Sequence, residues 1–180
     1  APTFQLDDSV GDNGTGIALA SKYSLGSFFG FTEGSSMLGL YYGDKLASNP
    51  NWFGPQNVIS DVDENTHLRI LASGVSQITE NFEIQPIILY QKTENATNEE
   101  TWASIGCRPI YHFNKNFALQ FEVGYDKTEN NDVEFDGTKL TIAPTITLDL
   151  GYYTRPQARI FVNRYMPNNG DEYTTFGAQM

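Results

Sequence analysis

The chain has 180 residues, of which 39% are hydrophobic, and its 22 acidic against 11 basic side chains give a formal net charge of −11. This balance argues against a nucleic-acid partner, because phosphates attract clustered Lys and Arg. The single cysteine, Cys107, excludes an intrachain disulfide. No stretch approaches the roughly 20 consecutive apolar residues of a transmembrane helix.

Apolar and polar residues alternate along most of the chain, which is typical of strands, since successive side chains of a strand point to opposite faces. Nine strands are predicted, near residues 16–24, 36–43, 66–77, 82–93, 100–113, 117–127, 138–148, 155–165 and 173–180. The separators are rich in Asn, Asp and Gly, which favour turns. We expect short and long connections to alternate, as at the two rims of a barrel.

The alternation gives each predicted strand one apolar and one polar face. In residues 117–126 the odd positions are Phe117, Leu119, Phe121, Val123 and Tyr125, and the even positions are Ala118, Gln120, Glu122, Gly124 and Asp126. The sequence predicts no helix that would cover the apolar faces. Either two sheets pack on each other, or lipid covers the outside of a water-filled barrel. The charged face favours an all-β, antiparallel transmembrane β-barrel.

Three prolines, Pro86, Pro109 and Pro144, fall inside predicted strands. Proline cannot donate to a strand ladder, so either these strands tolerate local interruptions or their boundaries differ from those predicted. Cys107 shares the parity of Ile105 and Pro109, which predicts an unreactive thiol on an apolar face.

The sequence contains no recognisable catalytic or metal-binding pattern. His67 and His112 are 45 positions apart, with no Cys or His at metal-ligand spacing. The acidic runs at 61–64 and 129–132 lack the ordered spacing of a calcium loop, so solvated loop charge is the preferred interpretation. We therefore predict a protein that is not an enzyme and has no cofactor or metal.

The polar face of one predicted strand combines aromatic and charged residues. Tyr153 and Phe161 share parity with Arg155, Arg159 and Asn163. Aromatic rings stack on the apolar faces of sugars, while Arg and carboxylates hydrogen-bond sugar hydroxyls, and a conducting site must release what it binds. The alternative, equally weighted on the pattern alone, is that the two rings pack within a small barrel or sandwich.

Seven blocks in a fixed order carry a family resemblance. They are residues 39–44, 67–71, 102–111, 122–126, 139–143, 154–161 and 175–180. On these blocks, the chain from about residue 24 to its end resembles the C-terminal half of a maltoporin, the maltodextrin-specific porin of the Gram-negative outer membrane.

The resemblance implies an 18-stranded trimeric barrel, to which residues 1–180 contribute about nine strands as a single domain. It also implies facilitated diffusion of maltose and maltodextrins along a file of lumen aromatics. Tyr153, just before Arg155 and Pro156, matches one position of that file, and Phe31 is the candidate for a second. Arg155, Arg159, Arg108 and Glu122 are the candidates for the flanking polar residues.

The implied partners are an oligosaccharide, outer-membrane lipid and two further copies of the chain. The chain departs from the family pattern, because the family's N-terminal half and terminal aromatics are missing, and we therefore expect it to be part of a longer protein. The alternative is a soluble β-sandwich or small closed barrel that acts as a carbohydrate-binding module.

Overall fold

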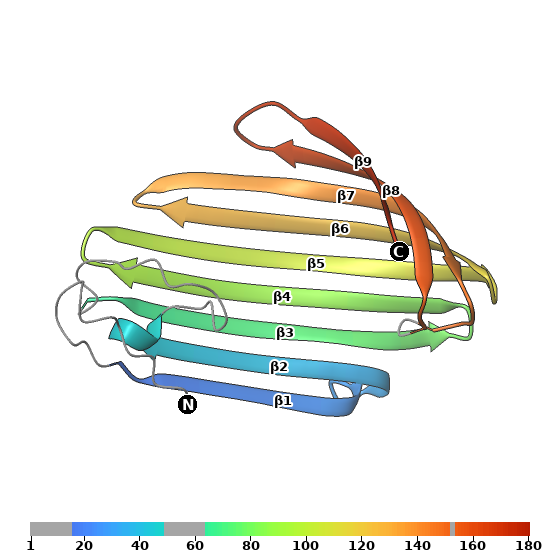
Figure 1. Ribbon diagram of the computed structural model, residues 1–180, viewed down its shortest axis with the longest axis horizontal. Coiled ribbons are helices and arrows are strands. Elements are labelled where there is room, and N and C mark those ends of the chain that lie inside the picture. Colours follow the sequence, from blue (N-terminus) through green and yellow to red (C-terminus); the bar gives the residue numbers. More distant parts are fainter. Residues whose placement is uncertain (1–15, 49–63, 152–153) are drawn as a thin grey trace.

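The computed structural model describes residues 16–48, 64–151 and 154–180. These residues form one antiparallel sheet of nine strands in chain order (Figure 1). The strands are β1 (Ala18–Phe28), β2 (Thr32–Asp44), β3 (Thr66–Thr79), β4 (Phe82–Asn95), β5 (Asn98–Asn114), β6 (Phe117–Asn130), β7 (Val133–Thr147), β8 (Gln157–Pro167) and β9 (Tyr173–Gln179). A short 3-10 helix, Lys45–Ser48, follows β2.

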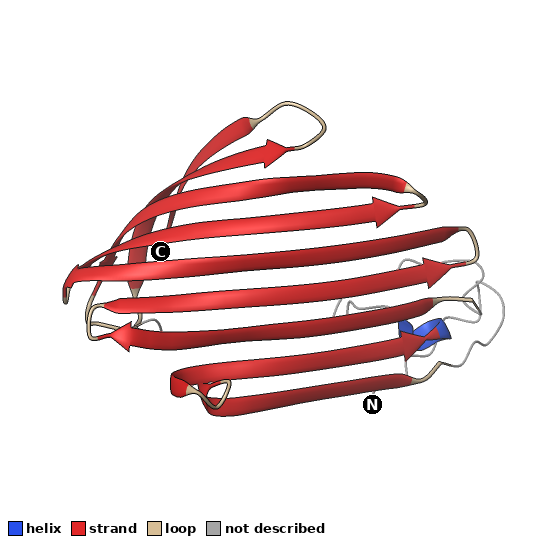
Figure 2. Cartoon of the chain, turned by 180° about the vertical axis from the view of Figure 1, so that it is seen from behind, coloured by secondary structure: helices blue, strands red, loops and turns tan. Residues whose placement is uncertain are grey.

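The predicted all-β antiparallel class and all nine strands are confirmed. The sheet is a single curved layer in which β1 and β9 are the two edges, so it is not closed into a barrel (Figures 1 and 2). Within the described residues no second sheet packs on it, which argues against the sandwich alternative.

Most strands are longer than predicted, because the chain reverses within only two residues between several of them. Between β6 and β7 the turn consists of Asn131 and Asp132, with φ values of 45° and 67°. Positive φ at both positions matches the right-handed twist of the flanking strands. Two-residue turns occur at both ends of the sheet, at 80–81 and at 96–97. The expected alternation of short and long connections is therefore wrong.

Cross-strand pairing keeps most of the exposed apolar side chains on one face of the sheet. One row runs from Leu38 through Ala72, Ile88 and Ile105 to Tyr125 on five successive strands. Ile88 and Ile105 expose 54% and 55% of their surface. We call this side the apolar face and the opposite side the polar face.

The most buried large side chains lie on the polar face. They include His67, Thr145 and Thr147, with exposed fractions of 0%, 1% and 2%. This arrangement inverts that of an ordinary soluble domain, in which apolar side chains fill the interior. Thr147 Oγ1 donates to the carbonyl of Asp149 at 3.0 Å, so this buried hydroxyl has a partner.

All three predicted intrastrand prolines lie inside strands, and each is paired on one side only. Pro86 lies opposite Cys107, Pro109 opposite Ile84, and Pro144 opposite Leu119. On the other side of each proline the register is interrupted, by two residues on each strand and without a shift. A residue without an N–H can face a neighbouring strand only where no ladder bond is required of it.

Within the described residues, no helix is long and apolar enough to span a membrane.

Candidate functional site

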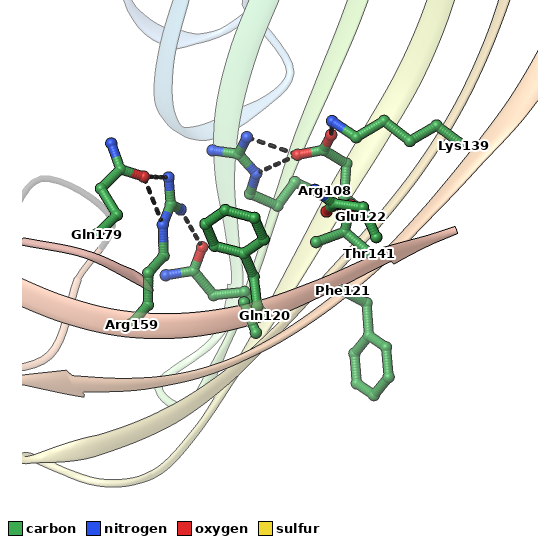
Figure 3. Close-up of a pocket in the computed structure, with 11 residues that line it drawn as sticks. Arg108, Gln120, Phe121, Glu122, Lys139, Thr141, Arg159 and Gln179 are labelled. Atoms are coloured by element: carbon green, nitrogen blue, oxygen red, sulfur yellow. Dashed lines mark hydrogen bonds and ion pairs between the residues drawn. The ribbon is translucent and has the colours of Figure 1, made fainter. Parts of the chain in front are cut away.

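A charged cavity of about 140 Å³ lies on the polar face of β5 to β9. Seven polar residues that line it come from five strands: Arg108 from β5, Gln120 and Glu122 from β6, Lys139 and Thr141 from β7, Arg159 from β8 and Gln179 from β9 (Figure 3). Even-numbered positions of β5 and β6 and odd-numbered positions of β7, β8 and β9 point to this side. The alternation of each strand therefore places all seven side chains on one wall.

Glu122 is the acidic centre of this wall. Its Oε2 accepts hydrogen bonds from Arg108 Nε at 2.9 Å and Nη2 at 2.6 Å, and its Oε1 accepts one from Lys139 Nζ at 2.6 Å. Figure 3 shows the carboxylate between the two cations. Charge-assisted bonds of this kind are shorter and stronger than neutral ones, so β5, β6 and β7 are cross-linked here.

Arg159 connects more distant strands through side-chain amides. Its Nη1 donates to Gln120 Oε1 at 3.0 Å, and its Nε donates to Gln179 Oε1 at 3.0 Å. The first contact reaches from β8 past β7 to β6, which is possible because the sheet curves toward its polar face. The ring of Phe121, by contrast, points away from this cluster.

Beside Thr141 the wall carries one aromatic ring and one side-chain amide. Phe161 and Asn163 of β8 line the cavity beside Thr141. Thr141 Oγ1 donates to Asn163 Oδ1 at 2.8 Å, and Asn163 Nδ2 donates to Thr175 Oγ1 at 3.3 Å.

A second cavity of about 380 Å³ adjoins the first, since Arg108, Gln120, Arg159 and Gln179 line both. Its other lining residues include Arg155, Pro156 and Gln157. Arg155 is exposed and its Nη1 donates to the carbonyl of Thr154 at 2.8 Å.

A buried acid–histidine pair lies on the polar face at the end of the sheet where β4 begins. Glu83 Oε2 is 3.6 Å from His112 Nε2, and their side chains are 6% and 2% exposed. Within the described residues, neither ring nitrogen of His112 has a hydrogen-bond partner. A Cβ added to Gly151 would lie 4.0 Å from Glu83 Oε1, so the segment after β7 lies beside this pair.

The structure brings together four of the six sequence-predicted site residues: Arg108, Glu122, Arg155 and Arg159. Phe31 lies instead in the turn between β1 and β2, is 84% exposed, and lines neither cavity. Tyr153 lies outside the described residues. Lys139 was not predicted from sequence, although its polar-face parity was a usable signal. Gln120 and Gln179 were not predicted either, because their amides are not distinctive in sequence.

The described residues contain no group of three or more His, Cys, Asp and Glu side chains that could hold a metal ion. Cys107 lies on the apolar face, opposite Pro86 and Val123, as its parity predicts.

The family model of the LamB porins matches residues 3–179. The chain belongs to the LamB porin family. The predicted maltoporin relationship is thus confirmed, and the match extends further toward the N-terminus than the seven sequence blocks do. LamB porins are outer-membrane channels of Gram-negative bacteria and not enzymes. The polar wall of β5 to β9 is accordingly a candidate wall of a porin lumen.

Proposed function

We propose that this LamB porin chain forms the C-terminal half of an 18-stranded, trimeric sugar porin. In this proposal its apolar face contacts outer-membrane lipid and its polar face lines the lumen. The pore passes maltose, maltodextrins or similar oligosaccharides by facilitated diffusion. The single observation that supports it best is the inverted burial, with polar side chains enclosed and Ile88 and Ile105 about half exposed.

The dimensions of the strands agree with this proposal. The strands β3 to β7 have 14 to 17 residues, whereas a tilted strand needs only about 9–11 residues to cross the hydrocarbon core. The surplus leaves room for polar residues at both interfaces. At one end, Phe113 contacts Tyr111 and Phe117 with ring-centroid distances of 5.0 and 5.4 Å. Aromatic residues of this kind suit a membrane interface.

Sugar binding in the lumen is proposed for Tyr153 and Phe31 as stacking residues and for Arg108, Glu122, Arg155 and Arg159 as polar contacts. The support for the polar group is that all four line the two adjoining cavities. The support for the aromatic pair is the family resemblance.

Liposome swelling with the full-length protein tests the proposal. We expect faster swelling in maltotriose than in a non-sugar solute of the same size. Equal rates would reject sugar selectivity, and no swelling in either solute would reject the pore itself.

A further inference from the structure

We infer that the wall between β5 and β9 binds an acidic saccharide, whose sugar ring lies against Phe161 and whose carboxylate lies among Arg108, Lys139 and Arg159. This inference rests on the proposed function and specifies the class of sugar. The sequence pattern offers Phe161 as one of two rings that could stack on a sugar, but neither that pattern nor the family match assigns an acidic substrate.

The charge around the two cavities is locally positive. The two adjoining cavities are lined by Arg108, Lys139, Arg155 and Arg159 but by one carboxylate, Glu122, among the described residues. The chain as a whole has 11 basic and 22 acidic residues. More than a third of the basic side chains therefore gather where one acidic side chain lies. A positively charged wall in an otherwise acidic chain raises the local concentration of anions.

The cations of this wall also carry more hydrogen-bond donors than Glu122 can accept from. A guanidinium has five N–H donors and an ammonium has three. Glu122 accepts from two nitrogens of Arg108 and from Lys139 Nζ. Glu122 thus orients both cations toward the cavity without using all of their donors. A ligand carboxylate has the acceptors that such donors require.

The ring of Phe161 packs against β9 at Gly177. A Cβ added to Gly177 would lie 2.3 Å from Cζ of Phe161 and 2.9 Å from both Cε atoms. The end of the ring therefore occupies the space left by the absent side chain of Gly177, packed on the backbone of β9. The ring is part-buried and lines the smaller cavity with Arg159 and Asn163. An aromatic surface edged by polar groups suits a sugar ring better than a simple anion.

The test uses the tryptophan emission of a Phe161→Trp variant of the full-length protein in detergent micelles, with the emission of the unmodified protein subtracted. The probes are trigalacturonate and, as the neutral control, galactotriose. We expect trigalacturonate to bind at least about tenfold more tightly, and raising NaCl from about 0.05 to about 0.5 M to reduce this preference, because salt screens the cations.

A second variant keeps the inference testable if Phe161→Trp does not fold. Calorimetric titration of trigalacturonate into Lys139→Gln should show a several-fold loss of affinity relative to the unmodified protein. The matched control is Lys127→Gln, because Lys127 pairs with Glu134 at 2.6 Å and lines neither cavity. Affinity in this control should be unchanged.

Equal affinity for the acidic and neutral trisaccharides, or no binding of either, would overturn the inference. Selective swelling of liposomes in maltotriose would in that case still support the sugar porin. Conversely, binding of trigalacturonate that depends on Lys139, together with no selective swelling, would support the acidic site and reject the proposed transport of neutral sugars.

Discussion

Glu122 has two cationic partners, and this makes it the most consequential single residue of the polar wall. Arg108 and Lys139 reach it from the strands on either side. Its side chain is 22% exposed, so water screens the interaction only in part. Removing the carboxylate charge would leave two neighbouring cations without their shared acceptor, which is more costly than losing one surface ion pair.

We therefore predict that Glu122→Gln lowers the free energy of unfolding by about 1–2 kcal/mol, through the loss of charge-assisted hydrogen bonds. Urea titration of the protein folded in lipid vesicles measures the change. The matched control is Glu134→Gln, since Glu134 is 52% exposed and, among the described residues, its ion pair is with Lys127. A control that destabilises as strongly as Glu122→Gln would contradict the special role of Glu122.

Tyr153 is one of the two residues proposed to stack on the sugar. Tyr153→Ala in the full-length protein should weaken maltodextrin binding by about 1 kcal/mol, the scale of an aromatic contact. Sugar-induced block of ion current through single pores measures this affinity. Tyr153→Phe serves as the control because it keeps the ring. If Tyr153→Ala were blocked as strongly as the unmodified pore, Tyr153 would not be a stacking residue.

At the scale of the element, the beginning of β2 packs unusually closely on β3. Gly34 has φ = 143°. A Cβ there would lie 1.9 Å from the carbonyl oxygen of Val75. Beside it, the hydroxyls of Thr32 and Ser76 are 2.9 Å apart. This close approach requires a glycine for two independent reasons, the backbone angle and the absence of space.

Gly34→Ala should accordingly destabilise the protein by about 2 kcal/mol or more, because both strain and overlap must be relieved. The control is Gly26→Ala at the irregularity in β1, where an added Cβ has nothing within 4 Å. That substitution should change stability by less than about 0.5 kcal/mol. Equal shifts of the two urea midpoints would show that the approach of Gly34 to Val75 is not close in solution.

The strands could be predicted from sequence because their signal is local. Alternation in residues such as Phe117 to Tyr125 requires no knowledge of the neighbouring strands. The side of a proline on which pairing stops depends on the partner, as at Pro109, and could not be predicted. The same holds for the contact between Arg159 and Gln120. It depends on the curvature of the sheet, which no spacing within β8 encodes.

For the candidate site, the sequence predicts only the face of the sheet on which each side chain lies. Parity correctly places Arg108, Glu122 and Arg159 on the polar side, but it gives no distance between them. Phe31 was selected by resemblance, and the structure places it in an exposed turn, away from both cavities. Parity also places Phe161 on the polar side. Its packing against Gly177 on the neighbouring strand depends on the register between β8 and β9, which parity does not give.

At the scale of the whole molecule, the proposed pore requires lipid on the apolar face and water on the polar face. Ile105 and Ser104 are adjacent in β5 and point to opposite sides, and Ser104 lies opposite Asp126. In a barrel that spans a bilayer, Ile105→Lys should cost about 2–4 kcal/mol near the midplane. Ser104→Lys should cost less than about 1 kcal/mol, since water and a carboxylate surround it. Folding free energies in lipid vesicles measure both, and the reverse order of the two costs would reject the assignment of the faces.

The most direct test uses the single cysteine of this chain. Cys107 lies in the middle of β5 on the apolar face, between Pro86 and Val123 of the neighbouring strands. A fluorophore attached to it in vesicle-embedded protein should be quenched by nitroxide-labelled lipid chains and protected from iodide in the aqueous phase. Quenching by iodide, with no effect of the labelled lipid, would show that water contacts the apolar face and would contradict the porin account.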